Sequence, residues 1–186
     1  MHVIVTMVTS TINSESGEVL EICLLPIDSQ KFTPFNRYLP LNIKLKHYVH
    51  RKSFNLSKYY RLGEPRSEIM SKEQAADDIK KFFKFINPRS EQEEMNFNLV
   101  CYNLPYVQDF VRDLLGDSFY FSNFGYSHID LMTLHTFFKK DRRYTSGFKS
   151  LSNCVDNYCR DNMDRCYTLS KVLTKCEGLK VGYIDE

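Results

Sequence analysis

Two runs of apolar, largely β-branched residues lie close together at the start of the chain. Residues 3–8 and 19–25 are almost uniformly hydrophobic, and a polar segment rich in Ser, Asn, Glu and Gly separates them. Val and Ile favour strands, whereas polar residues with Gly favour turns, so the pattern predicts two neighbouring strands of one sheet. A strand as apolar as residues 3–8 is typical of a central strand that is covered on both faces.

Three further segments have the composition of strands. Aromatic and polar residues alternate over residues 32–39 and the run stops at Pro40, which is typical of an edge strand because proline cannot donate a ladder hydrogen bond. We expect this strand to be antiparallel to its neighbour. Residues 97–102 are again apolar and are expected to run parallel to the first strand, and the aromatic segment 119–126 is β-prone. The five segments predict a mixed sheet.

Apolar residues at helical spacing fill much of the remaining sequence. Ser71 and Gln74 have the pattern of a capping box, and the helix that they open is predicted to continue to Ile86. Pro105 suits the first turn of a second helix. Further helices are predicted over residues 129–140, 150–158 and 164–175. This order predicts an α/β fold with helices on both faces of a five-stranded sheet. We expect residues 1–178 to form a single domain and residues 179–186 to form a C-terminal tail.

Composition narrows the class of protein. The 186 residues suffice for one well-buried α/β domain and are too few for two ordinary ones. The 25 Lys and Arg against 23 Asp and Glu leave a formal charge of +2, so a basic binding surface has to be local. No signal-peptide pattern and no apolar run of about 20 residues is present. We therefore expect a cytoplasmic protein without a membrane partner, whose six cysteines are reduced thiols.

Two sequence motifs carry a resemblance to a known enzyme family. They are residues 19–28, VLEICLLPID, and residues 99–111, LVCYNLPYVQDFV. They resemble segments of the DEDD exonucleases of the DnaQ-like group. The resemblance implies the ribonuclease-H-like fold, a first strand carrying Asp-x-Glu, and a last helix carrying His-x-x-x-x-Asp. In that family the acids hold two catalytic metal ions and the His activates water. The resemblance also implies that Asp130 has a structural role.

The family's catalytic positions are degenerate in this chain. In the register that the motifs imply, four acids and one His are replaced by Thr6, Val8, Val107, Cys166 and Lys171. Hydrolysis by two metal ions requires several converging carboxylates, since hard cations take oxygen ligands. We therefore predict a pseudo-exonuclease that is not an enzyme and holds no cofactor. The alternative is an active metal-dependent 3′–5′ exonuclease with relocated ligands, for which Asp109 is a candidate.

The cysteines near the C-terminus leave two interpretations open. The spacing of Cys154 and Cys166 resembles part of the Glu-Cys-His-Cys zinc site of Maelstrom domains, but Asn157 stands where that site has His. Cys159, His128 or a distant carboxylate would have to complete a structural zinc site, for which thiolate and imidazole are suitable ligands. The other interpretation is that the cysteines are buried, reduced and packed as small apolar side chains.

Two clusters mix cations with aromatic residues, at 44–61 and 139–149. Cations neutralise phosphates and exposed rings stack on unpaired bases, so both clusters are candidates for binding RNA or another single-stranded nucleic acid. The first follows a strand that resembles part of Exuperantia, which with Maelstrom implies germline RNA regulation and ribonucleoprotein granules. The open alternatives are solvated faces with inward aromatics, and a scaffold that binds a protein partner or forms a homodimer. The candidate nucleic-acid-binding residues are Lys46, Arg51, Lys52, Tyr59, Lys140, Arg142, Arg143 and Tyr144.

Overall fold

A computed structural model describes residues 1–10, 17–27, 34–39, 69–87, 97–138 and 162–178. It contains a five-stranded sheet of order β3-β2-β1-β4-β5. The strands are β1 (His2–Thr9), β2 (Val19–Pro26), β3 (Phe35–Tyr38), β4 (Asn98–Cys101) and β5 (Ile129–Asp130). β2 is antiparallel to both of its neighbours, β1 and β3, and β4 runs parallel to β1 and β5. The mixed sheet and the central place of β1 are as predicted.

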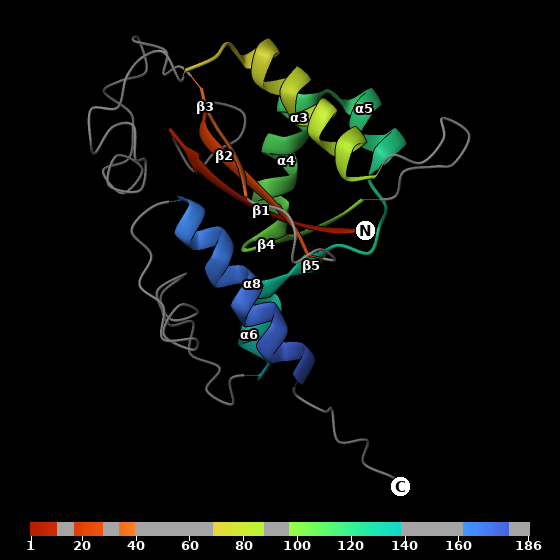
Figure 1. The fold of residues 1–186 in the computed structure, drawn as a ribbon. Coiled ribbons are helices and arrows are strands. Elements are labelled where there is room, and N and C mark those ends of the chain that lie inside the picture. The colour runs from red at the N-terminus through yellow and green to blue at the C-terminus, as the bar shows by residue number, and fades with distance from the viewer. Residues whose placement is uncertain (11–16, 28–33, 40–68, 88–96, 139–161, 179–186) are drawn as a thin grey trace, which may run out of the picture.

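Helices cover both faces of this sheet (Figure 1). They are α3 (Lys72–Ile86), α4 (Leu104–Leu115), α5 (Asp117–Asn123), α6 (Leu131–Phe138) and α8 (Asn162–Gly178). The first three lie over one face, and α6 and α8 lie over the other (Figure 1). The predicted three-layer α/β arrangement is confirmed. None of the described helices is both long and apolar enough to cross a membrane.

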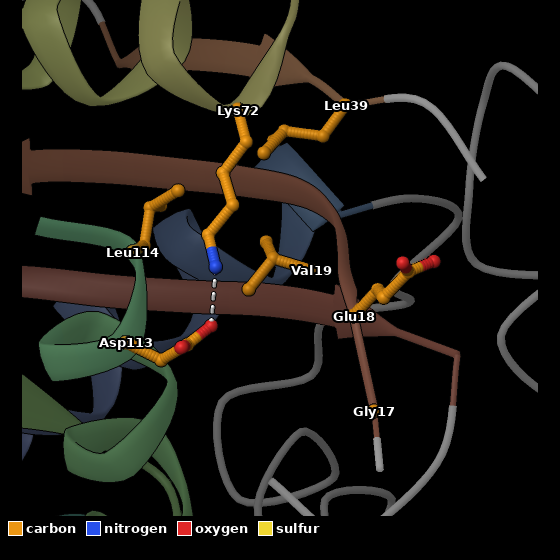
Figure 2. Close-up of a pocket in the computed structure, with 7 residues that line it drawn as sticks. All are labelled: Gly17, Glu18, Val19, Leu39, Lys72, Asp113 and Leu114. Atoms are coloured by element: carbon orange, nitrogen blue, oxygen red, sulfur yellow. Dashed lines mark hydrogen bonds and ion pairs between the residues drawn. The ribbon is translucent and has the colours of Figure 1, made fainter. Parts of the chain in front are cut away.

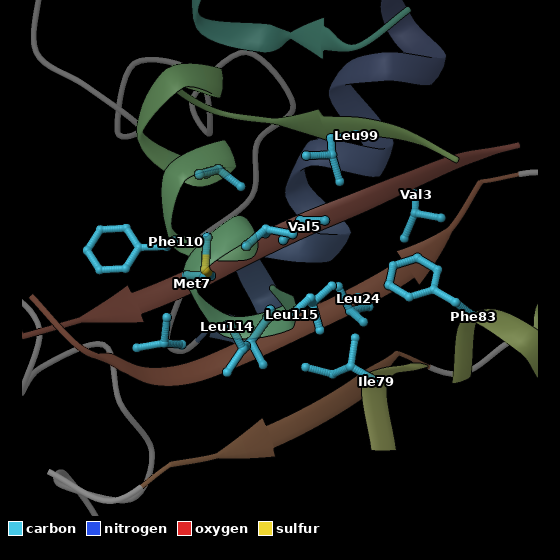
Figure 3. Packing of buried hydrophobic residues seen from close by; sticks show 14 of the residues in the cluster. Val3, Val5, Met7, Leu24, Ile79, Phe83, Leu99, Phe110, Leu114 and Leu115 are labelled. Atoms are coloured by element: carbon cyan, nitrogen blue, oxygen red, sulfur yellow. The ribbon is translucent and has the colours of Figure 1, made fainter. Parts of the chain in front are cut away.

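The larger core lies between the sheet and the layer of α3 and α4. Val3, Val5 and Met7 of β1 point into it, and Phe83 of α3 and Phe110 of α4 fill the space above them (Figure 3). The Phe83 ring also lies 4.6 Å, centroid to centroid, from the ring of Phe97, the residue just before β4. Because strand side chains alternate, the intervening residues of β1 point to the opposite face.

The second core lies between the sheet and α8. Ile4 of β1 and Cys23 of β2 meet Cys166 and Leu169 of α8 there, and all four side chains are buried. Seven of the eight residues of β1 are buried. The apolar character of residues 3–8 thus follows from two separate cores, one on each face of the strand.

The start of α3 has the predicted capping box. The Ser71 hydroxyl accepts a hydrogen bond from the Gln74 backbone N–H at 3.2 Å, and the Gln74 side chain accepts one from the Ser71 N–H at 3.0 Å. Two donors that a helix start leaves unsatisfied are thereby paired.

The prediction of a strand over residues 119–126 is wrong. Residues 117–123 form α5, and the strand beside β4 is the short β5 instead. Gly116 adopts a φ of 84°, which suits glycine, and turns the chain sharply from α4 into α5. The aromatic residues then pack at helical spacing, since Tyr120 stacks on Phe124 with centroids 4.7 Å apart. The helix predicted at 150–158 and the segment 44–61 lie outside the described residues.

Two phenylalanines on α3 give a direct test of this packing. We expect Phe83→Ala to lower the free energy of unfolding by about 3–5 kcal/mol, because it opens a cavity among four aromatic rings. Phe85→Ala is the matched control: the side chain is 69% exposed on the same helix, and we expect a change within about 0.5 kcal/mol. Urea unfolding of both variants measures the difference, and equal losses would contradict the described core.

Candidate functional site

The polar contacts that could form a site gather where β1 extends past β4. The pairing of β1 with β4 covers His2 to Ile4, whereas β1 itself continues to Thr9. Beyond Ile4 the starts of α4 and α8 approach the strand from opposite layers. We call the residues that meet there the β1-end cluster, and they are Thr6, Met7, Val8, Thr9, Tyr106, Val107, Asn162 and Arg165.

Thr6 and Asn162 hold the start of α8 on β1 by two reciprocal hydrogen bonds. The Thr6 hydroxyl donates to the Asn162 backbone carbonyl at 3.0 Å, and the Asn162 side-chain amide donates to the Thr6 carbonyl at 3.1 Å. Both side chains are buried. A buried hydroxyl and a buried amide are costly unless they are paired, so the two residues depend on each other.

A cation and two hydroxyls also lie at the β1-end cluster. Arg165, half-buried on α8, donates from Nη1 to the Met7 carbonyl at 3.1 Å. The Tyr106 hydroxyl hydrogen-bonds the Thr9 hydroxyl. Burial raises the pKa of Tyr106, and the Thr9 hydrogen bond and the charge of Arg165 act in the opposite direction. The phenol therefore keeps its proton near neutral pH, and the guanidinium lies close enough to affect it.

Three of the five positions that the resemblance predicts to be degenerate lie at the β1-end cluster. Thr6 and Val8 share the α8 face of β1, and Val107 is buried at the start of α4. Cys166 is buried one turn beyond Asn162, where its thiol faces the Ile4 carbonyl at 3.9 Å. This buried thiol fits the apolar packing that one of the two interpretations expected.

Lys171 does not lie where we expected it. It is exposed on α8, nine residues after Asn162, which corresponds to roughly 13 Å along a helix axis. Asn162 is the α8 residue that the structure brings to Thr6, and the sequence analysis did not single it out. A usable signal was present, because Asn162, Cys166 and Leu169 follow the i, i+4, i+7 spacing of one buried helix face.

The donors at the β1-end cluster do not fit a site for two metal ions. Thr6 and Asn162 offer a hydroxyl and an amide, and Val8 and Val107 offer no ligand atom. Divalent cations in such sites need several carboxylates. No group of three or more His, Cys, Asp or Glu in the described part of the chain is placed to hold a metal ion.

One buried acid near this cluster was missed by the sequence analysis. Glu21 of β2 pairs with Val8 across the two strands, and its side chain is only 1% exposed. Its Oε1 accepts a hydrogen bond from the Asn36 side-chain amide at 3.1 Å. Glu21 is the sole buried carboxylate among the residues that the structure describes. Its place inside an otherwise apolar strand was the available signal.

The other candidate acids lie elsewhere. The Asp130 carboxylate accepts hydrogen bonds from the Asn103 N–H, the Met132 N–H and the Thr133 hydroxyl, at 3.0, 3.0 and 2.9 Å. It thereby joins the β4–α4 turn to the start of α6, which is the structural role that the resemblance implies. Asp109 is exposed, lies farther along α4, and lines a shallow hollow at the C-terminal end of that helix.

His128 and Cys166 are not brought together. The His128 Nδ1 accepts from the Leu99 backbone N–H and its Nε2 hydrogen-bonds the Tyr120 hydroxyl, each at 3.0 Å. Both ring nitrogens are therefore used on the α5 side of the sheet, whereas Cys166 packs on the α8 side. The other two zinc candidates, Cys154 and Cys159, lie outside the described residues.

A separate pocket of about 160 Å³ lies on the α3 and α4 side (Figure 2). Glu18 and Val19 at the start of β2 line it, together with Leu39 and Leu114. The ammonium group of Lys72 forms an ion pair with Asp113 across it, at 2.7 Å. This pocket shares no residue with the β1-end cluster.

The eight residues that we predicted to bind nucleic acid all lie outside the described residues. Those in the first cluster fall within residues 40–68, and those in the second fall within residues 139–161. Their roles remain predictions from the sequence.

The fold is similar to that of E. coli exonuclease I, although no protein-family model and no curated protein matches the chain. The complex of that enzyme with a dT13 oligonucleotide gives a TM-score of 0.64 at 9% identity, over 95% of this chain and 41% of the other. The complex with a dA16 oligonucleotide gives 0.63 at 10% identity, over 94% and 40%. The zinc-bound form of its complex with single-stranded DNA gives 0.61 at 10% identity, over 95% and 40%.

These likenesses establish the fold class. The chain spans about two fifths of the exonuclease I chain. Sequence identities near 10% show a similar fold and nothing about activity. The predicted ribonuclease-H-like, exonuclease-like α/β fold is confirmed.

The reciprocal bonds between Thr6 and Asn162 predict energetic coupling. We expect Thr6→Val and Asn162→Ala each to lower the free energy of unfolding by about 1–3 kcal/mol, because each leaves a buried polar group without its partner. The double variant should lose less than the sum of the two. Thr174→Val, at an exposed position of the same helix, is the control and should change little. Additive losses in urea unfolding would refute the coupling.

His128 predicts a stability that depends on pH. Burial, with a smaller contribution from His2, lowers the pKa of His128 below its unfolded value. The unfolded chain therefore binds the proton first, so this contribution to stability is present above about pH 6.5 and is lost as the pH falls toward the lower folded pKa. We expect His128→Asn, whose Oδ1 can accept from Leu99, to flatten that part of the profile. Unfolding midpoints across this range measure it, and an unchanged slope would contradict the assignment.

Proposed function

We propose that this chain is a catalytically inactive exonuclease-like domain that binds RNA or another single-stranded nucleic acid. The observation that carries the proposal is the chemistry at the end of β1. In this fold, Thr6, Val8, Val107 and Asn162 lie where two layers of helices meet the central strand, and none of them is an acid. Cleavage by two metal ions depends on acids at such a place.

Binding is proposed from two supports of different kinds. The similar structures of exonuclease I hold dT13 and dA16 oligonucleotides, so this fold can carry a surface for single strands. The sequence supplies cations interleaved with Tyr and Phe at 44–61 and 139–149. Phosphate neutralisation together with base stacking recognises single strands with little dependence on sequence.

Two alternatives make different predictions. Glu21, buried beside Val8, favours an active 3′–5′ exonuclease with relocated ligands, because a buried carboxylate next to the degenerate position is a potential metal ligand. The second alternative is a scaffold that binds a protein partner or a second copy of the chain. Such a scaffold needs neither catalytic acids nor a nucleic-acid ligand.

The cellular part of our proposal, a cytoplasmic role in germline RNA regulation, rests on the resemblance to Exuperantia and Maelstrom. We also propose that residues 1–178 fold as one domain.

Titration with labelled single-stranded RNA and DNA at about 50 and about 200 mM salt tests binding. We expect affinity to fall steeply with salt, since released counterions drive binding. Replacing Arg51, Lys52, Arg142 and Arg143 with Ala should weaken binding to all sequences and reduce the logarithmic salt slope by up to about 3. Tyr59→Ala or Tyr144→Ala should cost about 1–3 kcal/mol if the ring stacks on a base.

A matched pair of double variants controls for net charge. Arg51 and Lys52 to Ala should weaken binding, whereas Lys81 and Lys84 to Ala should not, although both remove two cations. Lys81 and Lys84 are exposed on α3, in the layer opposite α8. Equal losses would show that only overall charge matters. Absence of binding by the intact chain at low salt would favour the scaffold.

Adding Mn²⁺ to the same titrations separates binding from cleavage. We expect no shortening of the labelled strand. Metal-dependent removal of 3′ nucleotides that Glu21→Gln abolishes would establish the nuclease with relocated ligands instead. Glu21→Gln keeps the size of the buried side chain and its Oε1 acceptor for the Asn36 amide.

A further inference from the structure

The pocket that is lined by residues of α3, α4 and β2 has rigid apolar walls. Its volume is about 160 Å³, and Val19, Leu39 and Leu114 form its apolar lining. Each of these side chains is at most 7% exposed, and all three belong to the larger core. Side chains that are held in a packed core do not collapse into a neighbouring space, so the cavity keeps its shape without a ligand.

An exposed ion pair crosses this pocket. Lys72 is the first residue of α3, and its Nζ donates to the Asp113 Oδ2 at 2.7 Å (Figure 2). Among the residues that the structure describes, each of these two side chains bonds only the other. Glu18 also lines the pocket, but Figure 2 shows its carboxylate pointing away from the pair.

Both members of the pair are accessible to a ligand. The side chains of Lys72 and Asp113 are 50% and 57% exposed, and exposed ion pairs contribute little to stability. The ammonium group has further N–H donors and the carboxylate has further lone pairs, beyond those that the pair uses. A ligand can therefore share or replace this contact at little cost.

The size of the pocket and the two opposite charges restrict the ligand. Pockets for drug-sized molecules usually enclose about 300–1,000 Å³, whereas an apolar cavity of about 150 Å³ takes a single benzene ring. An anion would pair with Lys72 and leave Asp113 unpaired, and a cation would do the reverse. A neutral ring whose edge has an acceptor beside a donor satisfies both groups.

A pyrimidine base has these properties. Cytosine and uracil are single rings with apolar faces, and each has a hydrogen-bond acceptor beside an N–H donor on its pairing edge. Carboxylates accept from the N4 amino group of cytosine in known base recognition. A purine adds a second ring, for which the cavity is small. A free apolar amino acid also offers both groups, but its two full charges lose water on binding, which costs more than the burial of an uncharged ring.

The pocket lies beside the place where the proposed function locates the degenerate site. Val19 pairs with Thr9, the last residue of β1, across the two strands. Val19 belongs to the core beneath α3 and α4, so the pocket opens on that side of the sheet. A single strand that passes the end of β1 is therefore close to the pocket.

We propose that this pocket binds one pyrimidine base of the bound single strand, with Lys72 donating to an acceptor of the base and Asp113 accepting from its N–H. This inference rests on the proposed function and names a base contact within it. Phosphate contacts carry no sequence information, so this pocket adds a preference for pyrimidines to binding that is otherwise indifferent to sequence.

Titration with nucleosides tests the pocket without the basic clusters, because cytidine and uridine carry no phosphate. We expect both to shift the NMR methyl signals of Val19, Leu39 and Leu114, with half-saturation at about 1–10 mM, since one ring and two exposed hydrogen bonds make a weak site. Adenosine should cause much smaller shifts. No shift with either pyrimidine nucleoside, or equal shifts with adenosine, would overturn the proposal. Shifts with L-leucine and none with the nucleosides would assign the pocket to an amino acid instead.

Charge-matched variants test the two polar contacts. Lys72→Gln and Asp113→Asn should each weaken cytidine binding about threefold to tenfold, because a neutral group replaces a charged hydrogen-bond partner. Lys84→Gln and Asp77→Asn remove the same charges from exposed positions of α3 and should leave cytidine binding unchanged. Thermal unfolding checks that all four variants are folded. Equal losses in the four variants would overturn the proposal.

Oligonucleotides separate this inference from the proposed function. Lys72→Gln should lower the affinity for a strand of cytosines and leave the affinity for a strand of adenines unchanged. Equal losses on both strands would overturn the base contact. Oligonucleotide binding without any nucleoside shift would remove this inference and leave the proposed function intact. Nucleoside shifts without oligonucleotide binding would support the pocket and remove the proposed function.

Discussion

The burial of β1 on both faces is the constraint on which the rest of the structure depends. Odd-numbered residues such as Val5 enter the core beneath α3 and α4, and even-numbered residues such as Ile4 enter the core beneath α8. A shift of one residue would exchange the two sets, so the register is strongly fixed. It also decides that Thr6 faces α8, and hence which α8 residue meets it.

The hydroxyl of Thr6 has different requirements from the acid that the resemblance would place at this position. A buried carboxylate needs a cation or a strongly shifted pKa, because burial disfavours its charge. A buried hydroxyl and a buried amide need no ion here, because the Thr6 hydroxyl donates to the Asn162 backbone carbonyl and the Asn162 side-chain amide donates to the Thr6 backbone carbonyl. The two neutral hydrogen bonds of Thr6 and Asn162, together with the charged donor Arg165 on the Met7 carbonyl, therefore attach α8 to β1.

The sequence was most informative where one local rule decided the outcome. The apolar run of residues 3–8 identified the central strand, and the capping box at Ser71 identified a helix start. The sequence was misleading where tertiary contacts overrode the β propensity of aromatic residues. This happened in α5, which was predicted as a strand and whose rings pack between helices instead. Asn162 was missed because family motifs were matched by spacing, and spacing alone favoured Lys171. The partners of Thr6 and Arg165 depend on how α8 crosses β1, which no local pattern contains.

Glu21 and Arg165 have opposite effects on the binding of a cation at the β1-end cluster. Glu21 could contribute one negative oxygen ligand, and the Asn162 Oδ1, which is buried and has no hydrogen-bond partner within the described residues, could contribute a neutral one. One charge and one amide fall short of the several carboxylates that two divalent ions require. Arg165, held on the neighbouring Met7 carbonyl, adds a fixed positive charge that disfavours any cation placed beside it. A guanidinium cannot lose its charge at physiological pH, so this positive charge does not change with conditions.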